Sequence, residues 1–228
     1  MILYNGHMRT LLEELCSTRN RLGCIIGYLC TNRIKFTLQP YHCGCNVIIG
    51  DPDNADFCFC AHYDVVTNSV GANDNTASVV VCLEHAIEGH QNSAVVLFDQ
   101  EEQLCNGRIE DMGSYVFGMD LKGSPHILVL DVCGIGDTII GHGDYLPSDV
   151  LNHYTPPSDD YALSLNNHKA SLISVLPEDQ LDSHMIWREL HTVYDTPDKI
   201  QDSTMLMMVD WIYTLILSSK EIHEDQKT

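Results

Sequence analysis

The sequence is poor in positive charge. Twelve Lys and Arg residues stand against 32 Asp and Glu residues, so the formal net charge is −20. A chain this acidic is repelled by phosphate backbones and by anionic lipid surfaces, so we expect neither nucleic acid nor a membrane as a partner. Bound divalent cations would cancel part of the excess charge. The remaining acidic groups are then expected on the solvated surface.

Long hydrophobic runs are also missing. The apolar stretch at 205–217 is too short to cross a membrane and contains Asp210. The residues after Met1 do not have the layout of a secretory signal, in which a basic segment precedes an apolar one. We therefore expect a soluble, cytoplasmic protein.

Paired cysteine motifs are absent even though the chain has ten cysteines. The cysteines occur singly or as Cys-x-Cys, at Cys43/Cys45 and Cys58/Cys60, inside apolar segments. Neither a zinc-finger spacing nor a small disulfide-rich framework is present, which predicts reduced, buried thiols in a cytosolic protein. The alternative is a second metal or redox site at Cys43 and Cys45, beside His42.

A nucleotide-binding loop and internal repeats are missing as well. Gly134 and Gly136 lack the third glycine and the following helix of a dinucleotide fingerprint, which excludes that function. No low-complexity linker divides the chain, and 228 residues are enough for a substantial hydrophobic core. We expect a single domain over residues 1–228.

Continuous apolar segments are the strongest structural pattern that is present. Segments 56–61, 93–98, 127–132 and 171–176 are predominantly apolar and do not alternate with polar residues, and stretches with helical periodicity separate them. Strands of this kind are typical of a parallel sheet covered by helices on both faces, which indicates an α/β fold. Helices are predicted at 8–19, 22–29, 75–88, 111–119, 160–167 and 202–219, and further strands at 34–38, 46–49 and 138–140.

Acidic and imidazole side chains follow these strands or lie in the adjoining loops. They are His62, Asp64, Asp74, Glu101, Glu102, Asp131, His191 and Asp195. The carboxyl ends of parallel strands meet at one edge of a sheet, so we expect these groups to lie together. So many carboxylates would repel one another and would be costly to bury without cations. A mixed set of imidazole and carboxylate ligands suits Zn²⁺ better than Ca²⁺ or Mg²⁺.

The order of the local motifs is specific. The motifs are Ala-His-Tyr-Asp at 61–64, Gly-Ala-Asn-Asp-Asn at 71–75, the pair Glu101-Glu102, Asp131 at a strand end, Ser158-Asp159, and His191-Thr192-x-x-Asp195-Thr196. Over residues 45–200 this set resembles the zinc-dependent aminopeptidase family, which includes bacterial leucyl aminopeptidases and, more distantly, glutaminyl cyclases. The resemblance implies a three-layer α/β/α sandwich with a mostly parallel, mixed central sheet.

The resemblance also implies two Zn²⁺ ions per chain, with Co²⁺ or Mn²⁺ as substitutes. One ion would be held by His62 and Asp131, and the other by Glu102 and His191. Asp74 would bridge both ions through its two carboxylate oxygens. The implied activity is that of a metallo-aminopeptidase, a hydrolase that acts on peptides with a free N-terminus.

Two acids would take part in catalysis without binding metal. By resemblance, Glu101 is the general base that takes a proton from the metal-bound water. Asp64 would accept a hydrogen bond from His62 and fix the tautomer of its ring. The resemblance further implies a cis peptide bond between Asp74 and Asn75.

Two other functions remain open. The first is an acyltransferase of the glutaminyl cyclase type, which would use one zinc ion, whereas this chain has both His62 and Asp131. The second is a catalytically silent relative that only binds peptides. In favour of the second, Gly113-Ser114 follows the acidic pair only after an additional segment at 103–112, which would lie beside the pocket. The intact Glu101 is an argument against it.

Overall fold

The computed structural model describes residues 2–89, 92–104, 106–183 and 185–225, and side chains from residue 6 to residue 219 within these ranges. Its core is an eight-stranded sheet in the order β1-β2-β4-β3-β5-β8-β6-β7. The four central strands β4, β3, β5 and β8 are parallel to one another, whereas the pairs β1–β2, β2–β4 and β6–β8 are antiparallel. The strands are β1 (Phe36–Pro40), β2 (Cys45–Ile49), β3 (Phe57–His62), β4 (Ser93–Phe98), β5 (His126–Leu130), β6 (Thr138–Gly143), β7 (Leu151–Asn152) and β8 (Ala170–Leu176).

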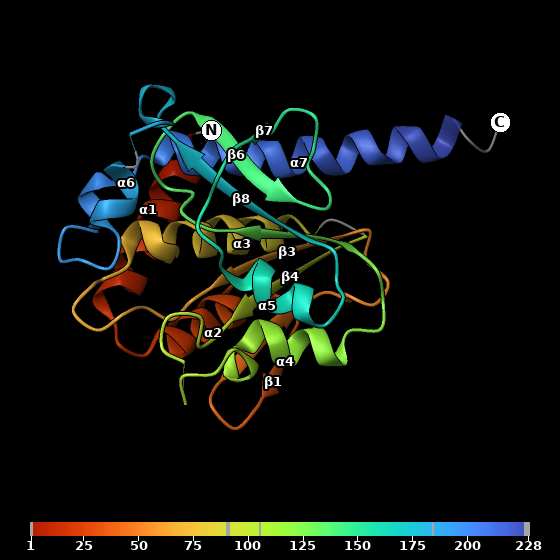
Figure 1. Ribbon diagram of the computed structural model, residues 1–228, viewed down its shortest axis with the longest axis horizontal. Helices are drawn as coiled ribbons and strands as arrows, with labels where there is room; N and C mark the ends of the chain where they lie inside the picture. Colours follow the sequence, from red (N-terminus) through yellow and green to blue (C-terminus); the bar gives the residue numbers. More distant parts are fainter. Residues whose placement is uncertain (1, 90–91, 105, 184, 226–228) are drawn as a thin grey trace.

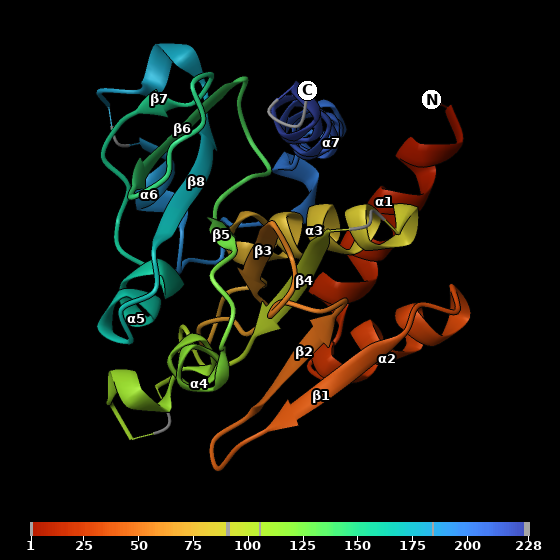
Figure 2. The same cartoon turned by 90° about the vertical axis from the view of Figure 1, so that its right-hand side faces the viewer.

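Helices cover both faces of this sheet, as the two views in Figures 1 and 2 show. Helices α1, α2, α3 and α7 share one hydrophobic cluster on one face, and α4 and α5 pack on the other. Figure 1 also shows α7 extending beyond the end of the sheet. The helices are α1 (Ile2–Ser17), α2 (Arg21–Thr31), α3 (Ala77–Glu88), α4 (Gly113–Asp120), α5 (Asp159–Leu165), α6 (Met185–Glu189) and α7 (Asp202–Asp225). The predicted α/β fold with a mixed, mostly parallel sheet is confirmed.

The central strands have buried side chains along almost their whole length. Every residue of β3 and of β8 is buried, and in β4 and β5 only the first residue is not. Strands with helices on both faces have no solvent-facing side, which explains their continuous apolar sequence. The core therefore places the carboxyl ends of these strands at a single rigid edge of the molecule.

Local signals account for several element boundaries. The side chain of Asn20 accepts a hydrogen bond from the backbone N–H of Gly23 at 3.0 Å and caps the start of α2. Gly89 follows α3 with a left-handed φ of 62°, a conformation that glycine adopts without steric cost. The ambiguous stretch at 22–29 is thus helical, whereas the helix α6 and the short strand β7 were not expected from the sequence. No helix in the described part of the chain is long and apolar enough to cross a membrane.

The prediction of reduced, buried cysteines is wrong for two residues. Cys43 carries a disulfide bond, and the free thiol of Cys30 is exposed. The other cysteines that the structure describes are free and at least partly buried. Cys43 lies in the turn between β1 and β2, where Asn106 donates to its sulfur at 3.8 Å. Sequence spacing could not reveal this contact because the two segments are distant along the chain.

Candidate metal centre

The ends of three neighbouring strands supply most of the candidate ligands. His62 is the last residue of β3, the pair Glu101-Glu102 follows β4, and Asp131 comes directly after β5. Asp74 lies in the helical turn Ala72–Thr76 that precedes α3, and its peptide bond to the next residue is cis. His191 lies in the loop after α6. The fold thus brings side chains from five separate segments to one edge of the sheet.

The ligand atoms form two groups that share Asp74. Oδ1 of Asp74 lies 3.3 Å from Nε2 of His62, and the same His62 nitrogen is 3.7 Å from Oδ1 of Asp131. Oδ2 of Asp74 lies 3.1 Å from Nε2 of His191, which is 3.0 Å from Oε2 of Glu102. In each group the three ligand atoms lie within 4.8 Å of one another. One carboxylate therefore faces two different imidazoles with its two oxygens.

Three buried polar atoms of the candidate ligand residues form no hydrogen bond. They are Nε2 of His62, Oε1 of Glu102 and Oδ1 of Asp131. A polar atom that is buried without a partner is costly, and buried polar groups are normally paired. Imidazole nitrogen and carboxylate oxygen are the donors that Zn²⁺ takes in proteins. The residues present therefore fit a metal centre, with each unpaired atom available as a ligand.

The electrostatics of the centre also favour a cation. Burial, together with the charges of Asp131 and Asp74, raises the pKa of Glu101 to about 7. Burial and the charge of Asp74 raise the pKa of Glu102 to about 9. The hydrogen bond with Asp74 raises the pKa of His191 to about 9. Without bound cations the centre therefore retains protons at pH values where free carboxylic acids have lost them.

Two further aspartates hold the backbone of the ligand segments. Asp64 accepts hydrogen bonds from the backbone N–H groups of Glu101, Glu102 and Gln103 at 3.1, 2.9 and 3.2 Å. Its Oδ1 is 3.5 Å from Nδ1 of His62, which also lies 3.3 Å from the backbone oxygen of Asp64. The carboxylate of Asp64 thus contacts both His62 and the acidic pair.

The second of these aspartates supports the bridging residue. Asp195 is 4% exposed, and its two oxygens accept the backbone N–H groups of Asn73 at 2.7 Å and Asp74 at 3.1 Å. Sequence reasoning placed Asp195 near the centre but assigned it no contact. The bond spans more than a hundred residues, so no local pattern predicts it.

Three non-glycine residues at the centre have left-handed backbone conformations. Gln100 precedes the acidic pair with φ 66°, Val132 follows Asp131 with φ 61°, and His191 itself has φ 61°. This region is uncommon for residues other than glycine, and for a β-branched residue such as Val132 it is an outlier. Such conformations concentrate at functional sites, where the surrounding structure holds them in place.

Two further residues, Asp159 and Trp187, lie beside the candidate ligands, and the sequence analysis assigned no role to either. Asp159 is fully buried, and burial, followed by the charge of Glu101, raises its pKa well above the usual range. Trp187 has a buried indole N–H without a partner, and it lines a cavity of about 170 Å³ together with Asp74 and Glu101. The motif Ser158-Asp159 was a signal for the first residue. Nothing in the sequence separates Trp187 from an ordinary core tryptophan.

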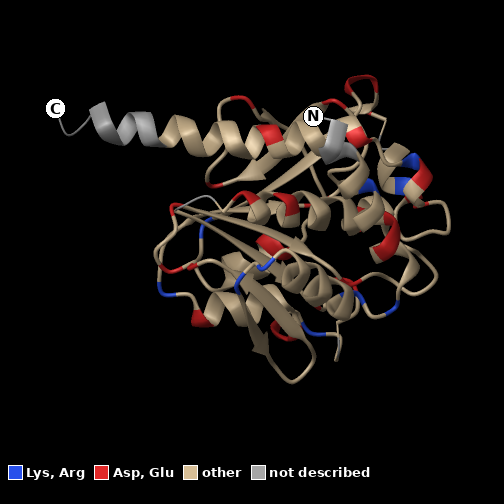
Figure 3. Cartoon of the chain, turned by 180° about the vertical axis from the view of Figure 1, so that it is seen from behind, with Lys and Arg blue, Asp and Glu red and all other residues tan. Residues whose placement is uncertain are grey.

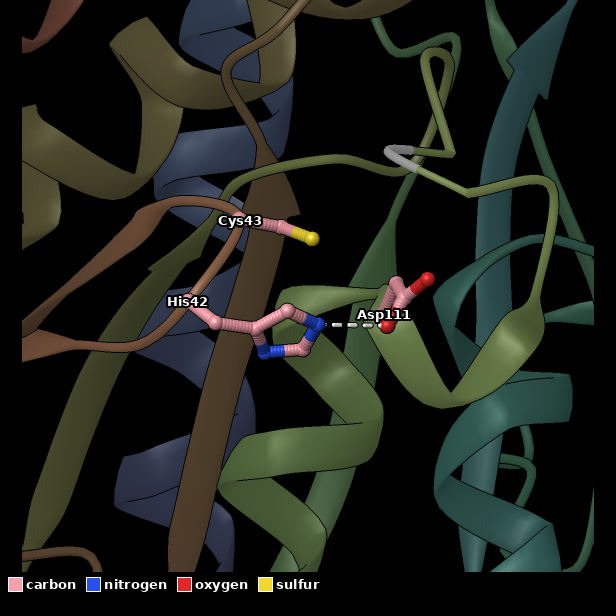
Figure 4. A group of neighbouring side chains, drawn as sticks. All are labelled: His42, Cys43 and Asp111. Atoms are coloured by element: carbon pink, nitrogen blue, oxygen red, sulfur yellow. Dashed lines mark hydrogen bonds and ion pairs between the residues drawn. The ribbon is translucent and has the colours of Figure 1, made fainter.

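The alternative of a second metal or redox site at Cys43 and Cys45 has a mixed outcome. His42, Cys43 and Asp111 lie close enough together to hold an ion, but Cys43 is in a disulfide bond, which argues against metal binding and leaves the redox alternative open. Figure 4 shows that His42 and Cys43 come from the β1–β2 turn, and Asp111 from the segment before α4. Nε2 of His42 lies 2.7 Å from Oδ1 of Asp111. Metal binding requires a thiolate, which the disulfide-bonded Cys43 does not provide. Cys45 is a free thiol in the following strand, and burial raises its pKa.

Fold and site together define an α/β protein with a candidate metal centre at the carboxyl edge of a mixed sheet. Residues 46–124 match the sequence profile of Peptidase family M28, which confirms the resemblance inferred from the motifs. The comparison with curated protein sequences finds no match.

Several solved structures have a similar fold. One is BSAP, a zinc aminopeptidase from Bacillus subtilis, with a TM-score of 0.61 and 18% identity over 77% of this chain and 50% of BSAP. Another is the glutaminyl cyclase of Fimbriiglobus ruber, with a TM-score of 0.66 and 17% identity over 90% of this chain and 92% of the cyclase. The glutaminyl cyclase of Tannerella forsythia has a TM-score of 0.68 and 14% identity, over 93% and 97% of the two chains. This chain thus spans about half the length of BSAP and nearly the full length of both cyclases.

Proposed function

We propose that this protein is a dinuclear zinc aminopeptidase that hydrolyses the N-terminal peptide bond of peptides. The observation that carries the proposal is the arrangement around Asp74, whose Oδ1 faces His62 and whose Oδ2 faces His191. Two ligand groups that share one carboxylate are suited to two ions held side by side. His62 and Asp131 would complete one group, and Glu102 and His191 the other.

The chemistry follows from the groups that surround this centre. Zinc, when bound, lowers the pKa of water and polarises a carbonyl group. Glu101 has a pKa of about 7, close to the value that suits a general base at neutral pH. We assign to Glu101 the removal of a proton from the attacking water and its transfer to the departing amine. Proton transfer of this kind contributes on the order of 10²- to 10⁴-fold in rate.

The cavity beside the metal centre suggests how a substrate would be selected. It has a volume of about 170 Å³ and is lined by the acids Asp74, Glu101 and Asp131 together with apolar groups such as Leu172 and Trp187. A protonated α-amine would be attracted to the acids, and the apolar groups would contact the first side chain of the peptide. An excess of carboxylates therefore favours peptides with a free N-terminus.

The variant Glu101→Gln tests the proposal. It keeps the shape of the side chain but removes the proton acceptor, so we expect kcat on aminoacyl substrates to fall by about 10² to 10⁴. Zinc binding should be retained because Glu101 is not one of the proposed ligands. Glu178→Gln, at an exposed acid that is not among the candidate ligands, is the matched control. Hydrolysis that continues in Glu101→Gln at the wild-type rate would rule out the assigned role.

A glutaminyl cyclase activity is the second candidate. It is favoured by the overlap in length, because the chain spans 92% and 97% of the two glutaminyl cyclases but only half of BSAP. Such an enzyme would close an N-terminal glutamine into a ring and release ammonia. About one zinc ion per chain, together with ammonia release from peptides that begin with Gln, would support this function. Two ions per chain and cleavage of free-amine substrates only would support the aminopeptidase.

A further inference from the structure

A buried arginine lies next to the candidate metal centre and contacts none of the ligands directly. Arg21, in the first turn of α2, is 7% exposed, and it is the only buried Lys or Arg among the residues whose burial is described. No carboxylate in the described part of the chain forms an ion pair with it. Burying an unpaired guanidinium costs several kcal/mol, so this placement requires compensation. Figure 3 shows Lys and Arg at few positions along the chain and Asp and Glu at many.

The guanidinium of Arg21 binds the two ends of one loop. Nη1 donates to the backbone oxygen of Tyr63 at 3.3 Å, and Nη2 donates to the backbone oxygen of Val70. This loop, residues 63–70, begins directly after His62 and leads into the turn that carries Asp74. A planar group with donors in fixed directions holds two acceptors at a set separation, which a single ammonium group does not do. The span of the loop therefore depends on Arg21.

The acids nearest to Arg21 compensate its charge from a distance. Burial lowers the pKa of Arg21, and the negative charges of Asp64, Asp195 and Asp74 act in the opposite direction. Asp64 holds the backbone of the acidic pair, and Asp195 holds the backbone of Asp74. Arg21 thus lies among the carboxylates that support both groups of ligands, and it offsets part of their mutual repulsion.

We propose that Arg21 is a positioning residue for metal binding, which sets the distance between His62 and Asp74 by holding both ends of the loop 63–70. This inference rests on the proposed function only in requiring that His62 and Asp74 bind a metal ion. It is independent of whether the protein cleaves peptides or cyclises glutamine. The alternative is that Arg21 merely attaches α2 to the sheet and stabilises the fold as a whole.

Zinc affinity in the absence of substrate is the decisive measurement, made by competition with a chromophoric chelator. We expect the zinc dissociation constant of Arg21→Lys and Arg21→Ala to rise about 10- to 100-fold, the range found when groups that orient metal ligands are removed. Arg19→Gln, at the exposed neighbouring arginine, should bind zinc like the wild type. Because no substrate is present, an inactive protein would not affect this result.

Chemical rescue separates positioning from general stabilisation. Arg21 lines an open cavity of about 840 Å³, so a small cation can reach the space left in Arg21→Ala. Millimolar ethylguanidinium should restore most of the zinc affinity of this variant, whereas ethylammonium should not. Wild-type zinc affinity in both variants would overturn the proposal. Loss of cooperative unfolding in Arg21→Lys would also overturn it, because Arg21 would then support the whole fold.

Discussion

The substitution Asp195→Asn separates the stability of the fold from the affinity of the metal centre. In the wild type the two carboxylate oxygens of Asp195 accept the backbone N–H groups of Asn73 and Asp74. The amide of Asn has one acceptor oxygen, so one N–H loses its partner, at a cost of about 1–3 kcal/mol. The backbone of Asn73 and the bridging residue Asp74 would then be held by one such hydrogen bond instead of two.

A second contribution to folding has the opposite sign. Burial raises the pKa of Asp195 from 3.8 to about 6, so the folded state binds the proton more tightly than the unfolded state. The stability due to this shift is fully present below pH 3.8 and is lost as the pH rises through 6. Ionised Asp195 therefore costs about 3 kcal/mol at neutral pH, since one pKa unit corresponds to 1.36 kcal/mol. An asparagine is neutral and avoids this cost.

The lost hydrogen bond lowers the free energy of unfolding and the removed charge raises it, so the two effects nearly cancel in folding. They do not cancel in metal binding. At pH 7.5 we expect the unfolding free energy of the metal-free Asp195→Asn variant to lie within about 2 kcal/mol of wild type. Zinc affinity should fall about 10- to 100-fold, because Asp74 is less firmly oriented. Urea unfolding and chelator competition on the same preparation measure the two quantities. Asp179→Asn, at an exposed aspartate, is the matched control and should change neither.

Either of two results would contradict the proposed role of Asp195. Zinc affinity equal to that of the wild type would mean that the hydrogen bonds from Asp195 do not orient Asp74. If Asp195→Asn lost much stability at pH 7.5 but none at pH 5, the ionised carboxylate of Asp195 would stabilise the fold, which is the opposite of the sign given above.

Zinc binding should also depend on pH. Glu102 and His191 have pKa values raised to about 9, and both must lose a proton to bind metal. We therefore expect the apparent zinc affinity to increase about a hundredfold per pH unit between pH 6 and 8, a factor of about ten for each proton released. Chelator competition at three pH values tests this, and a flat profile would contradict it. Gly113→Ala should lower the unfolding free energy by about 1–3 kcal/mol, because the added Cβ would lie 2.1 Å from Oδ1 of Asn46. Gly27→Ala has open space around its Cβ in α2 and should instead raise stability by about 0.5–1 kcal/mol in the same urea titration.

The sequence alone was sufficient for the fold class and for the convergence of the candidate ligands. Segments 93–98 and 171–176 are predominantly apolar without a polar alternation, a pattern typical of strands covered on both faces. The positions of His62 and Asp131 at strand ends then followed, because parallel strands end at a common edge. Such patterns can be recognised in the sequence because every position of an element that is buried on both faces requires an apolar side chain.

Contacts between distant segments were decided only by the tertiary structure. Arg21 reaches the carbonyl of Tyr63 across 42 residues, and Asp195 reaches Asn73 across 122 residues. The disulfide bond at Cys43 and the unpaired indole of Trp187 belong to the same class. Periodicity shows which face of an element is buried but not which partner meets it there. The candidate ligands and their convergence could therefore be predicted from the sequence, whereas the groups that contact the backbone of the candidate ligands became visible only in the folded chain.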